Sequence, residues 1–333
     1  MLTITSRLCR AAGMAALAAA LAATLVMSAA AWAQTAAAAY PTQSIKMIVP
    51  YPPGGATDTL ARLMAQKMQE GWSSSVVVEN RPGAGGTIGN GLVAKAAADG
   101  YTVLLAITAI IQQPTLMTLP YDPLKDFQPV SRIAISPSVF AVRPDLPASN
   151  VKEFVALVKA SPGKFSYGSY GAGTSSHIQG ELLNTQGGLD LAHVPFQGAA
   201  PLVVNMIGGQ LPAAFIDSAT SRPHLKVLKV LAVTGPQRMP ALPQVPTFAE
   251  QGFHSYEPLG WFGLFMPAGV PKHVLDKFSA EVLRVLKLPD VRERIEALGL
   301  FVGGESPEEF NKVMRSDAEV YARIIKLANI SLK

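Results

Sequence analysis

Residues 45–70 read IKMIVPYPPGGATDTLARLMAQKMQE. The apolar run Ile45–Val49 is typical of a buried strand, and the apolar residues after Thr59 recur at helical spacing. Pro and Gly residues between the two runs end the strand in a short turn. A strand, a Gly-rich turn and a helix in this order form the repeating unit of α/β proteins. This stretch therefore predicts an α/β fold with a largely parallel sheet.

The same alternation continues along the chain. Asn150 followed by Glu153 predicts the start of one helix, because this spacing forms a capping box. The further predicted strands are 76–79, 102–107, 165–168, 191–194, 213–216, 230–233 and 261–266. The further predicted helices are 87–98, 151–160, a helix from Thr174, 199–207, 271–286, 289–297 and 307–325.

The repeat of this pattern predicts two α/β lobes. Residues 112–147 interrupt it with recurrent prolines and are too broken for long helices, so we expect them to connect the lobes. We expect a discontinuous first lobe made of residues 40–141 and 256–333. The expected second lobe is 142–255.

Residues 1–33 have the anatomy of a secretory signal peptide. Arg7 and Arg10 form a basic start, residues 13–30 are rich in Ala and Leu, and residues 31–33 (AWA) form a small-x-small cleavage site. We expect cleavage after Ala33 and a periplasmic protein. An uncleaved membrane anchor is the alternative, since the apolar run is long enough to span a bilayer.

Charge and cysteine content exclude several classes of protein. The formal net charge of +5 becomes +3 without Arg7 and Arg10, and no run of Lys and Arg marks a nucleic-acid surface. Cys9 is the only cysteine and lies in the predicted leader, so the mature chain has no thiol for disulfides, metal sites or catalysis. The five histidines show no metal-ligand spacing. We expect no cofactor, no metal and no nucleic-acid partner.

Two Gly-rich loops are candidate anion sites. Residues 50–58 (PYPPGGATD) and 168–177 (GSYGAGTSSH) each follow a predicted strand and precede a predicted helix. Backbone N–H groups at such a helix start hold an anion without Arg or Lys, and Asp58 is placed to cap the first helix. An ordinary tight turn is the alternative for the first loop.

Enzyme chemistry finds less support. No G-x-S-x-G elbow surrounds the serines of the second loop, so a serine hydrolase is disfavoured. Residues 80–89 (NRPGAGGTIG) carry Ile88 where a dinucleotide-binding loop needs its last Gly, and a structural turn is favoured there. Among the histidines only His177 lies on the first turn of a candidate anion-binding helix, where it can bond either a ligand or the loop itself. Tyr51, Tyr170 and Phe196 can belong either to the core or to the rim of a cleft.

Ten ordered motifs, from about Tyr40 to the C-terminus, resemble the Bug family of extracytoplasmic solute receptors, which serve tripartite tricarboxylate transporters. The motifs are PGGATD (53–58), VENRPGAGG (78–86), DGYT (99–102), LPYDP (119–123), KDF (125–127), the loop 168–177, HVPFQG (193–198), GGQ (208–210), LAVT (231–234) and VPTFAE (245–250). The first loop differs from the usual family pattern by Ala56 in place of a third Gly. Residues 109–113 are also more apolar than expected, near positions that set ligand choice.

The resemblance implies a periplasmic binding protein of type II, a Venus flytrap of two α/β lobes that close on an organic anion. Its implied first jaw is 53–58 and its second is 169–175, with contributions from the ends of later strands. The ligand-binding residues expected from the loops and the resemblance together are Pro53, Gly54, Gly55, Ala56, Thr57, Asp58, Thr108, Ser169, Gly171, Ala172, Gly173, Thr174, Ser175, His177, Phe196, Gly198 and Asp217.

The predicted function is that of a monomeric solute-binding protein and not of an enzyme. It captures a small carboxylate, such as a C4–C6 dicarboxylate, an amino acid or an aromatic acid, and delivers it to membrane permease subunits. A periplasmic carboxylate sensor that feeds a membrane signalling system is the alternative, and the sequence does not separate the two.

Overall fold

A computed structural model describes residues 40–72 and 74–332. The chain divides into Met1–Thr42 and Gln43–Lys333, and the second unit holds every helix and strand discussed below. The predicted signal peptide and its cleavage site lie outside the described residues. None of the helices between residues 40 and 332 has the length and apolar character needed to cross a bilayer.

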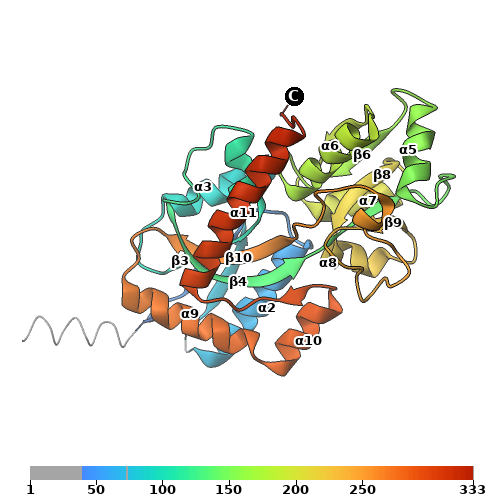
Figure 1. Cartoon of the computed structure of the whole chain (residues 1–333). Helices are drawn as coiled ribbons and strands as arrows, with labels where there is room; N and C mark the ends of the chain where they lie inside the picture. Colours follow the sequence, from blue (N-terminus) through green and yellow to red (C-terminus); the bar gives the residue numbers. More distant parts are fainter. Residues whose placement is uncertain (1–39, 73, 333) are drawn as a thin grey trace, which may run out of the picture. The chain divides into compact units, whose positions relative to one another are not determined.

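Eleven strands form two sheets within the described residues (Figure 1). The first sheet has the order β11-β4-β10-β3-β1-β2, and the second β7-β6-β8-β5-β9. The strands are β1 (Ile45–Val49), β2 (Val76–Asn80), β3 (Thr102–Ile107), β4 (Phe127–Ser136), β5 (Ser138–Val142), β6 (Ser166–Ser169), β7 (Ala192–Pro195), β8 (Ala213–Asp217), β9 (Lys229–Val233), β10 (Gly260–Pro267) and β11 (Phe301–Val302).

Helices connect and cover these strands. Asn150 caps its helix as predicted, because its side chain accepts the Glu153 N–H. The α-helices are α2 (Ala56–Gly71), α3 (Thr87–Ala94), α4 (Ala109–Gln112), α5 (Val151–Lys159), α6 (Ser175–Gly187), α7 (Ala199–Ile207), α8 (Ser218–Ser221), α9 (Lys272–Leu286), α10 (Pro289–Ala297) and α11 (Pro307–Leu327). Single 3-10 turns are η1 (Ala84–Gly86), η2 (Gln113–Thr115), η3 (Arg222–His224) and η4 (Ala249–Gln251).

The predicted α/β alternation is confirmed, and the sheets are mixed rather than largely parallel. β1 runs parallel to β2 and β3, and β6 runs parallel to β7 and β8. β10 is antiparallel to β3 and β4, and β5 is antiparallel to β8 and β9. β5 and β10 are the strands that enter each sheet from the other one, so they need no parallel crossover and can run in the opposite direction.

No strand is predicted within residues 112–147, whereas β4 and β5 occupy 127–142. Pro129 lies inside β4, where a central strand rarely tolerates proline. The pairing of β4 with β10 shifts register between Leu264 and Phe265, next to the Pro129 position, and this irregularity accommodates the ring. The sheet changes at Pro137, before the expected lobe start at residue 142. Division into two lobes that move separately stays a prediction.

Two chain crossings join the sheets side by side. The first is Ser136–Ser138, and the second begins at Thr234. The Ser138 N–H donates to Thr234 Oγ1 at 2.8 Å, and the Thr234 N–H donates to the Ser138 carbonyl at 2.9 Å. Ser136 also pairs with Gly260, where the second crossing enters β10. These bonds fix the two crossings to each other, and the paired crossings are called the hinge region below.

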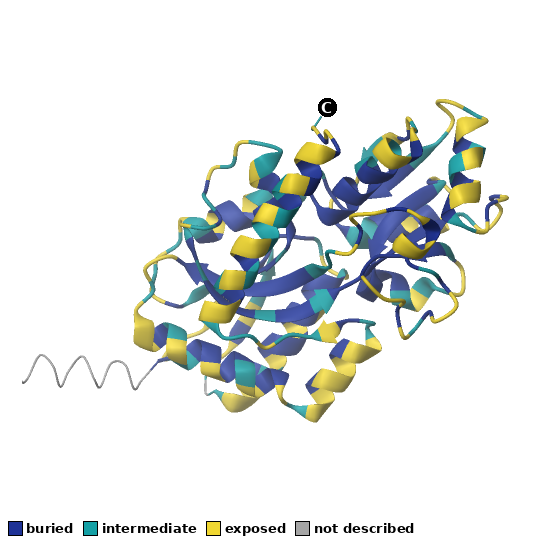
Figure 2. Ribbon diagram, in the orientation of Figure 1, coloured by how far each residue is buried: buried dark blue, intermediate teal, exposed yellow. Residues whose placement is uncertain are grey.

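The central strands of both sheets are buried, the edge strands β2, β7 and β11 are partly exposed, and the helices expose their outer faces (Figure 2). In the second sheet Phe140, Phe215, Phe248 and Tyr256 form one aromatic cluster, in which the rings of Phe248 and Tyr256 stack 3.9 Å apart. Aromatic packing of this kind contributes the largest part of core energetics.

We predict that Gly180→Ala destabilises the fold by about 1–3 kcal/mol, the usual effect of overpacking a core. A Cβ atom on Gly180 of α6 would lie 2.0 Å from Cε2 of Tyr167. Tyr167 is fully buried, and its hydroxyl donates to Glu181 at 2.7 Å, so the ring has nowhere to move. Urea denaturation measures the change in the free energy of unfolding.

Gly91→Ala in α3 is the matched control. The new Cβ would lie 3.6 Å from Pro120, an ordinary contact. Ala also favours a helix over Gly by about 1 kcal/mol, so stability should stay the same or rise. Equal losses in the two variants would contradict the packing described for Gly180.

Candidate functional site

A cavity lies where the two crossings meet the two sheets. About 40 Å³ of it is open to the centre of a water-sized sphere, which is room for about three ordered waters. Its lining residues come from both sheets: Tyr51, Pro52, Gly55, Ala56, Thr57, Ile107, Thr108, Ser136, Ser138, Tyr170, Ser175, Gly198, Ala199, Ala200, Asp217, Gly260, Trp261 and Phe262.

Three helices of eight residues or more begin at this cavity. Gly55 is the N-cap of α2, Ser175 is the first residue of α6, and Gly198 is the N-cap of α7, and all three residues line the cavity. The first N–H groups of a helix have no intrahelical partner, and each N-terminus carries the equivalent of about +0.5 charge. The cavity therefore combines backbone N–H donors and a positive potential, which makes it a candidate anion site.

No Lys, Arg or His side chain lines this cavity within the described part of the chain. Asp217 supplies the only carboxylate among the described lining residues. The hydroxyl groups come from Tyr51, Thr57, Thr108, Ser136, Ser138, Tyr170 and Ser175. Hydroxyl and backbone N–H donors bind an anion without the cost of desolvating a buried cation.

Hydrogen bonds fix two of the cavity hydroxyls. Thr108 Oγ1 accepts the Trp261 N–H at 2.7 Å, which ties the end of β3 to the start of β10. Ser175 Oγ accepts from Nε2 of Gln112 at 2.9 Å. Gln112 is fully buried and belongs to α4 of the first sheet's helices, so this second bond joins the two halves beside the cavity.

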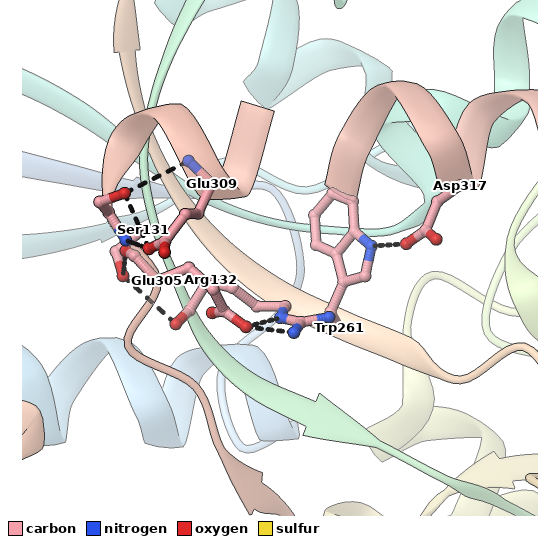
Figure 3. A network of polar contacts seen from close by, with 7 residues as sticks. Ser131, Arg132, Trp261, Glu305, Glu309 and Asp317 are labelled. Atoms are coloured by element: carbon pink, nitrogen blue, oxygen red, sulfur yellow. Dashed lines mark hydrogen bonds and ion pairs between the residues drawn. The ribbon is translucent and has the colours of Figure 1, made fainter. Parts of the chain in front are cut away.

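The C-terminal helix α11 fixes the indole ring of Trp261, which lines the cavity. Trp261 Nε1 donates to Oδ2 of Asp317 on α11 at 2.9 Å, as Figure 3 shows. Burial raises the pKa of Asp317, although the Trp261 bond acts against this. The same figure shows Arg132 of β4 paired with Glu305, which anchors the start of α11 to the sheet. The indole is therefore fixed by an element far away in sequence.

The structure divides the predicted first jaw into two groups. Gly55, Ala56 and Thr57 line the cavity, whereas Pro53 and Gly54 are exposed outside it. The Ala56 N–H donates to Thr220 Oγ1 of the second half at 3.3 Å, so this jaw is in contact with the opposite side.

Asp58 lies at the third helical position of α2 and faces its own loop. It accepts the Gly54 N–H at 3.1 Å and hydrogen bonds from Arg62 and Asn80 at 3.0 Å each. Burial acts to raise its pKa, but these bonds hold the pKa below the usual value. The cavity lining does not include Asp58, and its contacts make it a structural residue of the turn.

The predicted second jaw, 169–175, contributes Tyr170 and Ser175 to the cavity. Ser169, Gly171, Ala172, Gly173 and Thr174 do not line it. The Thr174 hydroxyl donates to the Gly171 carbonyl at 2.6 Å and is fully buried. A Cβ on Gly85 would lie 2.5 Å from the Ala172 carbonyl oxygen, so this loop packs on η1 of the other half.

His177 and Phe196 also lie away from the cavity, whereas Thr108, Gly198 and Asp217 line it. The His177 ring stacks on His193 with centroids 4.2 Å apart, and its Nδ1 accepts the Gly173 N–H at 3.3 Å. His193 Nε2 is 2.7 Å from Ser169 Oγ. Burial lowers the pKa of both imidazoles to about 4, so the pair is neutral near pH 7. The stacked pair therefore contacts the second loop at Gly173 and Ser169.

Several lining residues were not predicted from sequence. Ser136, Ser138 and Gly260 belong to the crossings, whose pairing only the fold reveals. Tyr51 and Tyr170, left open between core and rim, both line the cavity, and Tyr51 donates to the Gly85 carbonyl at 2.9 Å. No three His, Cys, Asp or Glu side chains come together as metal ligands in residues 40–72 and 74–332.

Comparison with known proteins gives consistent matches. A model of the tripartite tricarboxylate transporter family receptor matches residues 60–330. A protein encoded in the tcbD-tcbE intergenic region of a Pseudomonas species is 38% identical over 292 residues, which cover 86% of this chain and 87% of that protein.

Solved structures match over most of the chain. The periplasmic binding protein BugD has a TM-score of 0.84 and 33% identity, over 88% of this chain and 100% of its own. An R. palustris protein solved with adipate gives 0.84 and 32%, with the same coverage. MatC from Rhodopseudomonas palustris, with bound malate, gives 0.83 and 29%, over 86% of this chain and 100% of its own.

We predict that the fold loses stability as the pH falls from about 6.5 to about 4. In this range the unfolded chain protonates His177 and His193 while the folded chain holds them neutral, so protonation favours unfolding. Each pKa unit of difference is worth about 1.4 kcal/mol. Urea midpoints at about pH 7 and pH 4.5 measure the loss.

His193→Gln should make this loss smaller, because glutamine fills the site without titrating. His254→Gln, a change at an exposed histidine, is the control and should leave the difference between the two pH values as it is. An unchanged loss in His193→Gln would remove the stacked pair as its cause.

Proposed function

This chain belongs to the tripartite tricarboxylate transporter receptor family, and we propose that it captures a small carboxylate in the cavity and delivers it to membrane permease subunits. The resemblance to the Bug family is confirmed by the matches, and the two-sheet fold is that of periplasmic binding proteins. Proteins of this family are periplasmic solute receptors and not enzymes. We propose that this chain is likewise periplasmic after removal of residues 1–33, and that it acts as a monomer.

One observation carries the proposal: three helix N-termini converge on a cavity at the hinge region, and no basic side chain of the described residues lines it. This arrangement suits a carboxylate, which accepts several N–H and O–H bonds at once. The relatives solved with adipate and malate contain ligands of this class.

Contacts across the two halves support a closing mechanism. Ala56 contacts Thr220, Gln112 contacts Ser175, and the Ser218 hydroxyl donates to the Gly299 carbonyl at 3.0 Å. These bonds cannot all persist while a ligand enters a cavity this small, so the halves open and reclose. A ligand that touches both halves favours the closed population by its extra contacts in that state.

A thermal-shift screen tests the proposal. The purified protein is heated with mono-, di- and tricarboxylates, acidic amino acids and benzoate-type acids, with the matching amides as controls. A ligand at about 100 times its Kd adds about 2.7 kcal/mol of stability, which raises the melting temperature. A folded, ligand-free protein that responds to no carboxylate would contradict the proposed function.

Thr57→Val should weaken binding of any carboxylate found in this screen by about 1 kcal/mol, the usual worth of one hydrogen bond, measured by calorimetry. Thr57 is buried and lines the cavity. Thr59→Val on the same helix is the control, because Thr59 is exposed and its hydroxyl donates to the Gly55 carbonyl. Equal affinity in both variants would remove Thr57 from the site.

A further inference from the structure

The Gly-rich stretch 80–89, which joins β2 to α3, has no role in the proposed function. Every residue of this stretch is described, and none of them lines the cavity. Its backbone is nevertheless unusual, because residues 83–86 have φ angles of 135°, 49°, 62° and 102° in succession. The second of these residues is Ala84, and a non-Gly residue adopts a left-handed conformation only at some cost. Such a turn persists where the surrounding contacts require it.

The turn 83–86 packs against the second loop, which belongs to the half built on the second sheet. A Cβ on Gly85 would lie 2.5 Å from the Ala172 carbonyl oxygen, and a Cβ on Gly171 would lie 3.1 Å from Cα of Gly85. The two backbones therefore touch, with no room for a side chain between them. Tyr51 fixes the turn within the first half, because its hydroxyl donates to the Gly85 carbonyl at 2.9 Å.

Gln113 completes the first half's side of this contact. It is fully buried, its Nε2 donates to the Gly85 carbonyl at 3.0 Å, and its Oε1 accepts from the Thr87 hydroxyl at 3.3 Å. Its stem faces the second loop, because a Cβ on Gly173 would lie 2.8 Å from Cγ of Gln113 and 3.4 Å from Cε of Met117. The three atoms nearest to that Cβ all belong to the first half.

The polar groups on each side of this contact are satisfied by their own half. On the second loop, Thr174 donates to the Gly171 carbonyl at 2.6 Å, and the Gly173 N–H donates to Nδ1 of His177 at 3.3 Å. The bonds of Gln113 to Gly85 and Thr87 stay within the first half in the same way. Separating these surfaces therefore leaves none of these groups without a partner, and the contact between them is one of shape.

We propose that residues 83–86 and Gln113 form a latch, a surface on which the second loop seats when the halves close, and that this latch favours closure before a ligand binds. The inference rests on the proposed function and adds a control of affinity from outside the cavity. Apparent affinity scales with the population of the binding-competent form, so a latch that touches no ligand still sets it. Glycine is needed at positions 85, 171 and 173, because a side chain at any of them holds the halves apart.

Gly173→Ala tests the latch, and Gly163→Ala is the matched control. Both glycines have a φ of +72°, so a Cβ brings the same backbone strain to each. A Cβ on Gly163 has nothing within 4 Å, whereas one on Gly173 meets Gln113 of the other half. We expect only Gly173→Ala to lower the closed population, because its methyl group fits only when the halves are apart.

Pulsed electron paramagnetic resonance between two spin labels measures the closed population without any ligand. Leu92→Cys on α3 and Ala156→Cys on α5 place the labels at exposed positions on different halves, and Cys9→Ser removes the chain's own cysteine. We expect Gly173→Ala to lower the closed fraction about fivefold relative to Gly163→Ala, the effect of overpacking a tight contact. Equal closed fractions in the two variants would overturn the inference.

Affinity for the carboxylate found in the thermal-shift screen is the second readout. Calorimetry should show a loss of affinity by the same factor as the closed fraction, because both depend on one population. A loss of affinity at an unchanged closed fraction would mean that Gly173 contacts the ligand, which would overturn the latch. If no carboxylate binds, the proposed function fails, and the spin-label comparison still decides the inference.

Gly85→Ala gives the same test from the other side of the contact. Its methyl group would meet the Ala172 carbonyl oxygen, so we expect the same loss of closed population if Gly173→Ala fails to fold. Urea denaturation of each variant shows whether the fold is retained. A folded Gly85→Ala variant with the closed fraction of the wild type would overturn the inference.

Discussion

The pairing of the two chain crossings is the constraint on which the site depends. Ser138 and Thr234 exchange two hydrogen bonds, and Ser136 pairs with Gly260, so both crossings are held at one place. Three of these residues, Ser136, Ser138 and Gly260, also line the cavity. Any movement of the two sheets about the crossings must therefore change the cavity itself. In the proposed function, binding and closure are therefore coupled, because both involve the same backbone.

We propose that the cavity binds its ligand through backbone dipoles and hydroxyl groups rather than through basic side chains. The strand ends of both sheets point their following helices at one space, so helix N-termini supply the positive potential. A buried Lys or Arg would have to be desolvated and paired before ligand arrives, whereas backbone dipoles are already oriented by the fold. Supporting contacts then fix the hydroxyl and aromatic groups, as Gln112 does for Ser175 and Asp317 does for Trp261.

Local sequence signals predicted the elements well and the site only in part. The strand 45–49 and the cap at Asn150 follow from short-range patterns, and both are confirmed. The loops with helix starts led to Ala56, Thr57 and Ser175 at the cavity. Sequence did not show that Thr174 bonds its own loop or that Asp58 is held by Arg62 and Asn80, since these depend on side-chain direction. The strand β4 was missed because a proline argues against a strand, and Pro129 lies beside an irregularity in which Val130 of β4 has no partner on β10.

A crystal structure of the protein grown with a carboxylate identified in the thermal-shift screen tests the central claim most directly. The account predicts a carboxylate group within hydrogen-bonding distance of the backbone N–H groups at the starts of α2 and α7, with no Lys or Arg side chain in contact. A ligand bound outside the hinge cavity, or one whose carboxylate is held by a basic side chain, would contradict it.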